Sequence, residues 1–331
     1  MAHKIIAKGS IGKIVYPSLF TGSRLLVSKI AIEADVIDEY KFGRHVINEI
    51  EEKEDGYGDC ETFLVDKKVY RRYRFGVYGL NYEPLLAYST RMQKRRWDNL
   101  IEKSPDLCNI DPMASYLMHM EKADGDVHSL LEQCTPKTLF AALLALRNVA
   151  IGLTKLHDAQ IYHFDVKPSN ILFFGSLKNP ETMKIGDFGL AHKIDDGDIW
   201  NAASLQFPWH NFPPWASYIA LFYQGGSQYE LAQKEHDIRI FFEKPESERF
   251  SCVDEELYMR MQIDIAPFLQ DPALLFCAVD IYGLALCLHR IYWLAPLRVR
   301  SHIEQFCSDA AMCALRDDDI LDRWDDMLRA F

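Results

Sequence analysis

Residues 161–172 read IYHFDVKPSNIL and set three polar side chains inside an otherwise apolar stretch. Lys167 and Asn170 follow Asp165 by two and five positions, and a proline comes directly after the lysine. Apolar runs on both sides predict a tight loop between two short strands, and such loops often carry catalytic groups. A second strand-like run leads into Asp-Phe-Gly at residues 187–189. Each Asp or Asn alone would also suit a turn cap, but the ordered pair of motifs favours a functional site.

The composition bounds the class of protein. The chain has 331 residues, of which 49% are hydrophobic, so it can form one large or two medium domains. Its formal net charge of -11 at pH 7 disfavours non-specific binding to nucleic acid, which is itself a polyanion. The eight cysteines include no CxxC pair, which is typical of reduced thiols. We therefore expect an intracellular, cytoplasmic protein without a nucleic-acid partner.

Neither a signal peptide nor a membrane span is predicted. The N-terminal stretch MAHKIIAKGSIGKIV lacks a long apolar run, because glycine and charge interrupt it. The most apolar later stretch, residues 273–297, carries Asp280, His289 and Arg290, which are costly in a bilayer but ordinary in a buried helix. No membrane partner is therefore expected.

The patterning of the chain changes near residue 120. Before it, strand-like runs such as KIIAKGSIGKIVY and RLLVSKIAI are rich in Ile. After it helices dominate, and the most apolar of them begins at Thr135, a capping residue type, followed by Pro136. We expect two domains, residues 1–120 and residues 121–331.

The motif H-x-D-x-K-P-x-N, followed at this spacing by D-F-G, resembles the signature pair of the eukaryotic-type protein kinases. The resemblance implies an α+β fold of two lobes, a small β-rich N-lobe at 1–120 and a larger helical C-lobe at 121–331. It also implies ATP and Mg²⁺ as cofactors in the cleft between the lobes. The lysine two positions after Asp165 is the pattern of the serine/threonine branch, so the expected substrates are Ser and Thr hydroxyls of proteins.

The resemblance assigns a role to each polar residue of the two motifs. Phosphoryl transfer depends on positioning and charge neutralisation more than on covalent chemistry. Asp165 would orient the substrate hydroxyl or accept its proton, and Lys167 would steady the γ-phosphate. Asn170 and Asp187 would each hold a Mg²⁺ ion, which prefers hard oxygen ligands.

The segment IAKGSIGKIVY resembles the glycine loop that covers the ATP phosphates in kinases. The motif G-x-G-x-x-G-x-V falls on Ala7, Gly9, Gly12 and Ile14, so an alanine replaces the first glycine. Gly9 and Gly12 still permit close approach of the backbone to a phosphate. The same segment would also suit an ordinary hairpin turn.

Lys29, in the run RLLVSKIAI, resembles the strand lysine that binds the α- and β-phosphates, although a lone strand lysine is often a solvated edge residue. Its expected ion-pair partner lies on the next helix, within residues 35–55. Glu39 fits best, because the apolar residues that follow it would pack one helix face, and Glu49 is the second choice. A solvated carboxylate is the alternative for either.

The segment SYLMHMEKADGD resembles the strand and hinge that join the kinase lobes. On that resemblance Met120 would be the gatekeeper beside the adenine pocket, and the backbone from Glu121 to Ala123 would hydrogen-bond the adenine edge. Asp126 would lie near the ribose or would cap the helix that follows it.

Three features depart from the kinase pattern. Phe164 replaces the arginine that normally binds a phosphate on the activation segment, which predicts activity without activation-loop phosphorylation. Trp215 replaces the glutamate of the A-P-E signal, and an aromatic contact would take the place of its ion pair. An insert at 216–276, expected at the surface, precedes the buried helix in which Asp280 would anchor the catalytic loop. Only short helices are expected after Ala295.

The P-P-W end signal, the start GSIGKIVYPSLF and the insert look most like the divergent kinases of large nucleocytoplasmic DNA viruses, which would place the protein in host cytoplasm or in the virion. Two basic clusters, at 66–75 and 91–97, would dock an acidic substrate, a phosphorylated segment or nucleic acid, or would be the solvated faces of a strand and a helix. The sequence specifies no oligomeric state.

Two other functions are weighed against the protein kinase. A pseudokinase scaffold would bind nucleotide or partner proteins without turnover, and Ala7, Phe164 and Trp215 favour it. Retention of every residue with an assigned ATP or metal contact opposes it. A kinase of small molecules that shares the fold is the third hypothesis, and the run HFDVKPSN favours protein acceptors over it.

Overall fold

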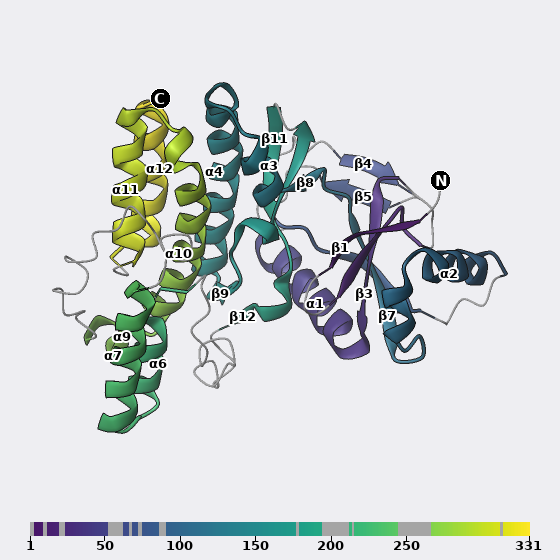
Figure 1. The fold of residues 1–331 in the computed structure, drawn as a ribbon, viewed down its shortest axis with the longest axis horizontal. Coiled ribbons are helices and arrows are strands. Elements are labelled where there is room, and N and C mark those ends of the chain that lie inside the picture. Colours follow the sequence, from purple (N-terminus) through teal and green to yellow (C-terminus); the bar gives the residue numbers. More distant parts are fainter. Residues whose placement is uncertain are drawn as a thin grey trace. The chain divides into compact units, whose positions relative to one another are not determined.

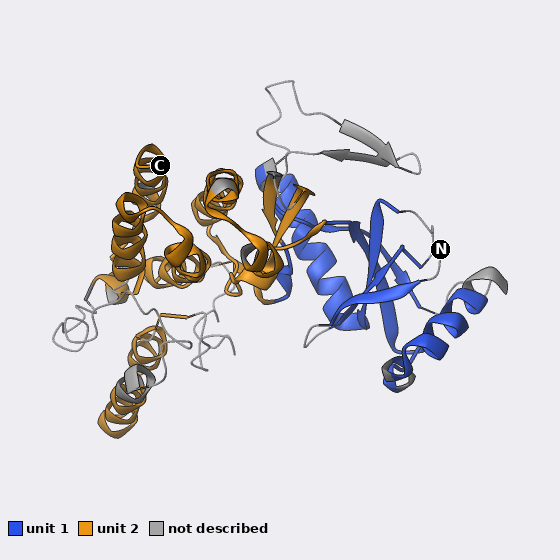
Figure 2. Cartoon of the chain, turned by 45° about the horizontal axis from the view of Figure 1, so that its top comes forward, with its two compact units in different colours: residues 1–123, 186–189 blue, residues 124–185, 190–331 orange. Residues whose placement is uncertain are grey.

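A computed structural model shows two compact units (Figure 2). The residues it describes are 3–8, 12–19, 24–51, 62–65, 68–71, 75–85, 91–176, 179–193, 212–213, 215–243, 266–311 and 314–331. The smaller unit comprises Met1–Ala123 with Gly186–Gly189, and the larger unit comprises Asp124–Ile185 with Leu190–Phe331. A strand-rich smaller unit and a largely helical larger one confirm the predicted α+β class.

The division falls at Ala123 rather than at the expected residue 120. Strand pairing explains the difference, because Glu121 is still in register with Leu26 and the Lys122 amide donates to the Leu25 carbonyl at 3.0 Å. Backbone hydrogen bonds thus join Glu121 and Lys122 to the strand that begins at Leu26, so both residues belong to the smaller unit.

The smaller unit is built on an antiparallel five-stranded sheet with strand order β1-β2-β3-β7-β6 (Figure 1). Its strands and helices are β1 (Lys4–Lys8), β2 (Lys13–Tyr16), β3 (Leu26–Ile32), α1 (Glu33–Val46), β6 (Gly79–Pro84), α2 (Arg91–Lys103) and β7 (Ser115–Glu121). A π-helical turn, Ile47–Glu51, extends α1, and a separate hairpin pairs β4 (Thr62–Val65) with β5 (Lys68–Arg71). Residues Lys68–Arg71 of the first basic cluster accordingly lie on β5, and the second cluster lies on α2.

The central strand β3 is buried on both faces, and its alternation sets the position of Lys29. Successive side chains of a strand point to opposite faces. Ile30 packs with Leu117 and Leu100 in the cluster under α2, whereas Ala31 packs with Val36 of α1. Lys29 has the same parity as Ala31, so its side chain is directed to the face that α1 covers.

The larger unit is mainly helical and carries two small sheets (Figure 1). Its helices are α3 (Val127–Gln133), α4 (Pro136–Asp158), α6 (Ala216–Tyr223), α7 (Gln228–Glu243), α9 (Ala266–Gln270), α10 (Ala273–Ile291), α11 (Leu297–Ala311) and α12 (Asp317–Arg329). One sheet joins β11 (Asn179–Ile185), β10 (Ile171–Ser176) and β8 (Gly125–Asp126), and the other joins β12 (His192–Lys193) and β9 (Ile161–Tyr162). Short 3₁₀ turns cover Pro168–Asn170 and Tyr292–Leu294 in this unit, Pro105–Asn109 in the smaller unit, and Phe188–Leu190 at the boundary between them.

The predicted start of the long helix α4 is confirmed. Thr135 and Thr138 form a reciprocal capping box, and Pro136 is the first helical residue, where its missing N–H costs nothing.

Both α4 and α10 contain stretches long and apolar enough to cross a membrane, yet 56% and 78% of those stretches are buried inside the fold. Such burial is what core helices of a large domain show.

The predicted surface insert at 216–276 is partly wrong. Ala216, Ile219 and Ala220 of α6 are buried in an apolar cluster of the larger unit, together with Phe276 of α10. Helix α6 is amphipathic only weakly and rich in apolar residues, so it is driven into the core. By contrast, most of the described side chains of α7 are exposed.

The last two helices complete the core of the larger unit. Trp324 of α12 is fully buried, its Nε1–H donates to the Leu143 carbonyl of α4 at 3.1 Å, and its ring meets Phe306 of α11 edge-on. Beside it, the Arg147 guanidinium binds both carboxylate oxygens of Asp325 at 2.7 and 3.0 Å. These contacts tie α12 to α4 by packing and by a two-bonded ion pair.

We expect Trp324→Ala to lower the free energy of unfolding by about 3–5 kcal/mol, because it leaves a large cavity and removes the buried hydrogen bond to the Leu143 carbonyl. Urea unfolding followed by circular dichroism measures this. Trp293→Ala is the matched control, since Trp293 is 66% exposed, and it should cost less than about 1 kcal/mol. Equal losses in the two variants would contradict the assigned role of Trp324.

Candidate active site

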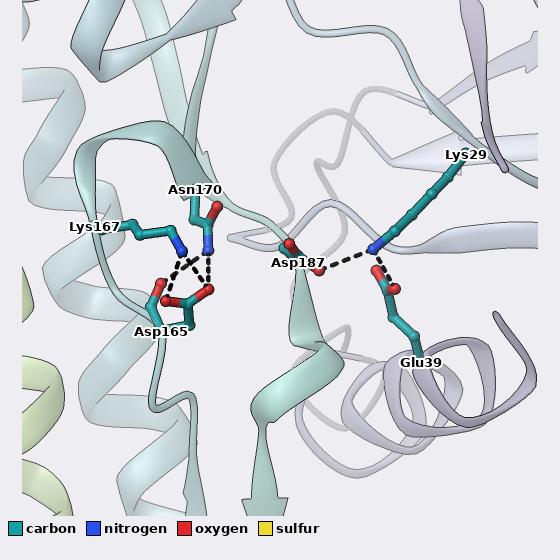
Figure 3. Close-up of polar contacts among 6 residues, drawn as sticks. All are labelled: Lys29, Glu39, Asp165, Lys167, Asn170 and Asp187. Carbon is teal, nitrogen blue, oxygen red and sulfur yellow. Dashed lines mark hydrogen bonds and ion pairs between the residues drawn. The ribbon is translucent and has the colours of Figure 1, made fainter. Parts of the chain in front are cut away.

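The loop between β9 and β10 brings together the three polar side chains of the first motif (Figure 3). The Lys167 ammonium donates to both carboxylate oxygens of Asp165, at 2.8 and 2.7 Å. The Asn170 amide nitrogen donates to Asp165 Oδ2 at 2.7 Å and to the Asp165 carbonyl at 3.0 Å. Two neighbours therefore orient the Asp165 carboxylate, and the donation by Nδ2 leaves the amide oxygen of Asn170 as its candidate metal ligand.

Asp280 of α10 anchors this loop, as the sequence predicted. Its carboxylate is fully buried and accepts the backbone N–H of His163 at 2.7 Å and that of Phe164 at 2.8 Å. A buried charge is tolerated only when hydrogen bonds replace its hydration. Two peptide groups directly before Asp165 are thus fixed to the core helix.

Phe164 occupies the position expected for arginine and has a left-handed backbone, with φ of 58°. This conformation is unfavourable for a bulky residue and costs on the order of 1–3 kcal/mol. The side chain is fully buried, with its ring centroid 5.5 Å from that of Phe276 and 6.1 Å from that of Tyr162. Apolar burial of an aromatic side chain is large enough to offset the strain.

The second motif lies in the smaller unit with Lys29 and Glu39 (Figure 3). The Lys29 ammonium, on a residue only 6% exposed, donates to Glu39 Oε2 at 2.6 Å and to Asp187 Oδ1 at 2.9 Å. Burial acts to lower the pKa of Lys29, but the charges of Glu39 and Asp187 outweigh it and raise that pKa above its usual value. Lys29 therefore stays cationic at neutral pH. Of the two candidate partners Glu39 makes the ion pair; the side chain of Glu49 lies outside the described residues.

The aromatic residue of the second motif is held against α1. Phe188 is buried, and its ring lies 5.0 Å from that of Tyr78 and 6.4 Å from that of Phe42. Asp187 itself has a left-handed backbone, with φ of 63°, which a short polar residue adopts more readily than a bulky one. The backbone turn and the Phe188 contacts together direct the Asp187 carboxylate to Lys29.

The expected glycine loop connects β1 and β2, which form a hairpin. Ala7 and Ile14 pair directly across it, and Gly9 lies outside the described residues. A Cβ at Gly12 would lie 2.8 Å from the Ile30 carbonyl oxygen and 3.4 Å from Cε of Lys29. Gly12 therefore lets the hairpin approach β3 beside Lys29. The hairpin is confirmed, and its role toward ATP phosphates stays a prediction.

The expected hinge residues lie at the end of β7. Met120 and Glu121 are in register with Val27 and Leu26, and Ala123 is the last residue of this part of the smaller unit. Their roles toward adenine stay predictions. For Asp126, the capping alternative is confirmed, because its Oδ1 accepts the backbone N–H of Ser129 in the first turn of α3 at 2.7 Å.

Trp215 makes the aromatic contact that was predicted in place of an ion pair. Its side chain packs against the apolar cluster that contains Phe276 and α6, and lies edge-on to Tyr218, with ring centroids 5.6 Å apart. Pro213 is buried just ahead of it, and Pro214 lies outside the described residues. An aromatic contact thus stands where the family pattern has an ion pair.

Two supporting residues were not found from the sequence. A Cβ at Gly283 would lie 2.2 Å from the Val166 carbonyl oxygen, so only glycine lets α10 approach the catalytic loop. His157, near the end of α4, is buried, and its Nε2 lies 3.1 Å from Asp280 Oδ2, the oxygen that also accepts the His163 N–H. A glycine one helical turn after Asp280, on the same face, was the available signal for Gly283.

Comparison with known proteins agrees with this geometry. Residues 100–206 match the sequence model of the family described as protein kinase domain, and this range contains both motifs. The chain is 38% identical over 90 residues to a calcium and calcium/calmodulin-dependent serine/threonine-protein kinase of Lilium longiflorum, covering 24% of this chain and 17% of that protein. It is 33% identical over 112 residues to serine/threonine-protein kinase atg1 of Dictyostelium discoideum, covering 33% of this chain and 17% of that protein.

A third relative, mitogen-activated protein kinase 2 of Oryza sativa subsp. japonica, is 38% identical over 79 residues, or 24% of this chain and 19% of the relative. The chain thus matches less than one fifth of the length of each of these curated relatives. The match to the family model covers the segment that carries Asp165, Asn170 and Asp187, and the strand-rich and helical units have the α+β architecture of the protein kinase fold.

Proposed function

We propose that the protein is an ATP-dependent protein kinase that transfers the γ-phosphate of Mg-ATP to Ser or Thr hydroxyls of protein substrates. One observation carries the proposal: the Asp165 carboxylate is oriented by Lys167 and Asn170 on a loop that a buried carboxylate fixes to the core. A group placed in this way meets the geometric demand on a base that positions a hydroxyl for transfer.

The larger unit would handle the acceptor. Asp165 orients the Ser or Thr hydroxyl and takes its proton, while Lys167, already bonded to that carboxylate, compensates charge beside it. The Asn170 amide oxygen suits Mg²⁺, which prefers hard oxygen donors. Asp280 already fixes the backbone that carries Asp165, Lys167 and Asn170, so these groups can act without a movement of the loop.

The smaller unit would bind the nucleotide. Lys29 is a buried cation whose pKa its carboxylate partners raise, which suits it to phosphate oxygens, and Glu39 keeps it in place. Gly12 lets the β1–β2 hairpin lie close to β3 beside Lys29. The Asp187 carboxylate is the oxygen ligand expected for the second metal position. When bound, Mg-ATP supplies the phosphoryl group and the charge that these residues neutralise.

We further propose that the enzyme works without activation-loop phosphorylation. In related enzymes an arginine before the catalytic aspartate binds such a phosphate, and Phe164 cannot do so. Its ring instead packs with Tyr162 and Phe276, which holds the loop by apolar contact. Trp215, packed in the same cluster, supports this proposal at the end of the segment.

A location inside the cell, and a place among the kinases of large DNA viruses, are also kept as proposals. They rest on the cysteine usage, on the P-P-W signal and on the long stretch ahead of α10. The pseudokinase scaffold is the competing function, and the departures Ala7, Phe164 and Trp215 motivate it. Transfer activity separates the two.

Asp165→Asn and Asp187→Asn should each lower phosphate transfer by about 10²–10⁴-fold, because each removes a positioned carboxylate. Radiolabelled γ-phosphate from Mg-ATP, followed onto Ser and Thr of the protein itself and of a generic basic protein, measures the transfer. Asp158→Asn is the control, since Asp158 is exposed at the end of α4. Wild type that binds ATP in a thermal-shift assay but transfers no label would favour the scaffold.

Glu39→Gln should lower kcat/KM for ATP by about 10–100-fold, because Lys29 loses the carboxylate that fixes it and a small misplacement is costly. Steady-state kinetics with varied ATP measures the change. Asp38→Asn, an exposed carboxylate on the same helix, should behave as wild type. A Glu39→Gln variant with unchanged kinetics would remove the assigned role of the ion pair.

Protein freed of phosphate by a phosphatase should transfer phosphate at the same initial rate as untreated protein. Mass spectrometry of the intact chain verifies removal, and the phosphatase is itself removed before ATP is added. A large drop in initial rate that recovers with time, as the protein phosphorylates itself, would contradict independence from phosphorylation.

A further inference from the structure

Four polar side chains meet behind the catalytic loop, and the proposed phosphoryl transfer uses only one of them. His157 ends α4, Cys277 and Asp280 lie one turn apart on α10, and Asp317 is the first residue of α12. His157 Nδ1 lies 2.6 Å from Asp317 Oδ1, and its Nε2 lies 3.1 Å from Asp280 Oδ2. The Cys277 thiol donates to Asp317 Oδ2 at 3.3 Å. A nitrogen, a sulfur and an oxygen donor thus converge from three helices.

The spacing of these donors suits a single ion. One nitrogen of His157, the sulfur of Cys277 and a carboxylate oxygen of Asp317 all lie within 4.8 Å of one another. Tetrahedral zinc, with bonds of about 2.0–2.3 Å, separates its ligand atoms by about 3.3–3.8 Å. The Sγ–Oδ2 distance of 3.3 Å already has this value. Binding an ion between these groups would require the Nδ1–Oδ1 distance, now 2.6 Å, to open toward this range.

Asp280 supplies the outer hydrogen bond that metal-binding histidines ordinarily make. Such a histidine donates its second ring N–H to a carboxylate, which fixes the tautomer and the ring plane. The Nε2–Asp280 contact of 3.1 Å leaves Nδ1 directed at Cys277 and Asp317. The ring is further held by Tyr162, stacked at a centroid distance of 5.5 Å.

Charge is conserved when a divalent ion replaces the protons of this cluster. Both ring nitrogens of His157 face carboxylate oxygens, and the Cys277 thiol donates to Asp317, so Nδ1 and Sγ each hold a proton in the metal-free cluster. Coordination releases one proton from Nδ1 and one from Sγ, so two positive charges leave and two enter. The net charge of the buried groups does not change.

We propose that His157 Nδ1, Cys277 Sγ and a carboxylate oxygen of Asp317 bind a divalent transition-metal ion of the zinc class. The mixed nitrogen, sulfur and oxygen donors favour such an ion over Mg²⁺ or Ca²⁺, which prefer oxygen alone. The side chain of Asp317 is 24% exposed, which provides an entry path and a fourth position for water. The site is separate from the residues assigned to Mg-ATP.

An ion here would act on the catalytic loop through one intermediate residue. His157 contacts the same Asp280 carboxylate that accepts the backbone N–H groups of His163 and Phe164. Fixing the His157 ring therefore also restrains Asp280. Binding to the folded state alone stabilises that state by mass action, so the ion should raise the unfolding temperature.

The test is a Co²⁺ titration of the full chain after treatment with a chelator and its removal. We expect one tight equivalent, a thiolate-to-cobalt absorption band in the near ultraviolet, and competition by Zn²⁺. Cys277→Ser should abolish the band, and Asp317→Asn should weaken affinity by at least about 10–100-fold. Cys287→Ser, a buried thiol on the same helix that donates to the Gly283 carbonyl, is the matched control and should keep the band.

Circular dichroism in chelator verifies that each variant is folded, and Asp317→Asn, at a partly exposed position, serves if Cys277→Ser does not fold. Absence of the band in folded wild type, or a band that survives both substitutions, would show that these groups form a hydrogen-bonded cluster only. Asp165→Asn should bind Co²⁺ as wild type does. Failure of the metal site and failure of the proposed transfer activity can therefore be distinguished.

Discussion

The buried carboxylate of Asp280 is the constraint on which the candidate catalytic loop depends. It accepts two backbone N–H groups of that loop and faces His157, so both of its oxygens are engaged inside the protein. A carboxylate in this position without such partners would be strongly destabilising. The loop backbone and α10 therefore hold each other, and the position of Asp165 follows from a core helix rather than from the loop alone.

Each of the two motifs also contains a residue in the left-handed backbone region, Phe164 in one and Asp187 in the other. Such conformations persist only where the surroundings over-determine them. Phe164 is held by aromatic burial, and Asp187 by its bond to Lys29. In both cases the strained turn directs a carboxylate, that of Asp165 in the first motif and that of Asp187 in the second. An apolar contact with Phe276 maintains the first turn, and the ion pair with Lys29 maintains the second.

Local patterns predicted the parts of the structure that depend on neighbouring residues. The strand–loop–strand around Asp165, the cap of α4 at Thr135 and the Lys29–Glu39 pair are all encoded within short stretches. The burial of α6 and the His157–Asp317 contact depend on residues far apart, 160 positions in the second case. Periodicity carries no information about such pairs, so tertiary packing decided them.

The proposed independence from phosphorylation and the proposed metal site share one physical basis. An enzyme with an arginine at position 164 would carry a buried cation whose charge must be balanced from another segment. Phe164 removes that cation, and the ionisable groups packed behind the loop include Asp280, His157 and Asp317, which lie on three helices of the larger unit. If the proposed metal site exists, the loop would respond to a metal ion or a proton on His157, because the His157 ring contacts the same Asp280 carboxylate as the backbone of the catalytic loop.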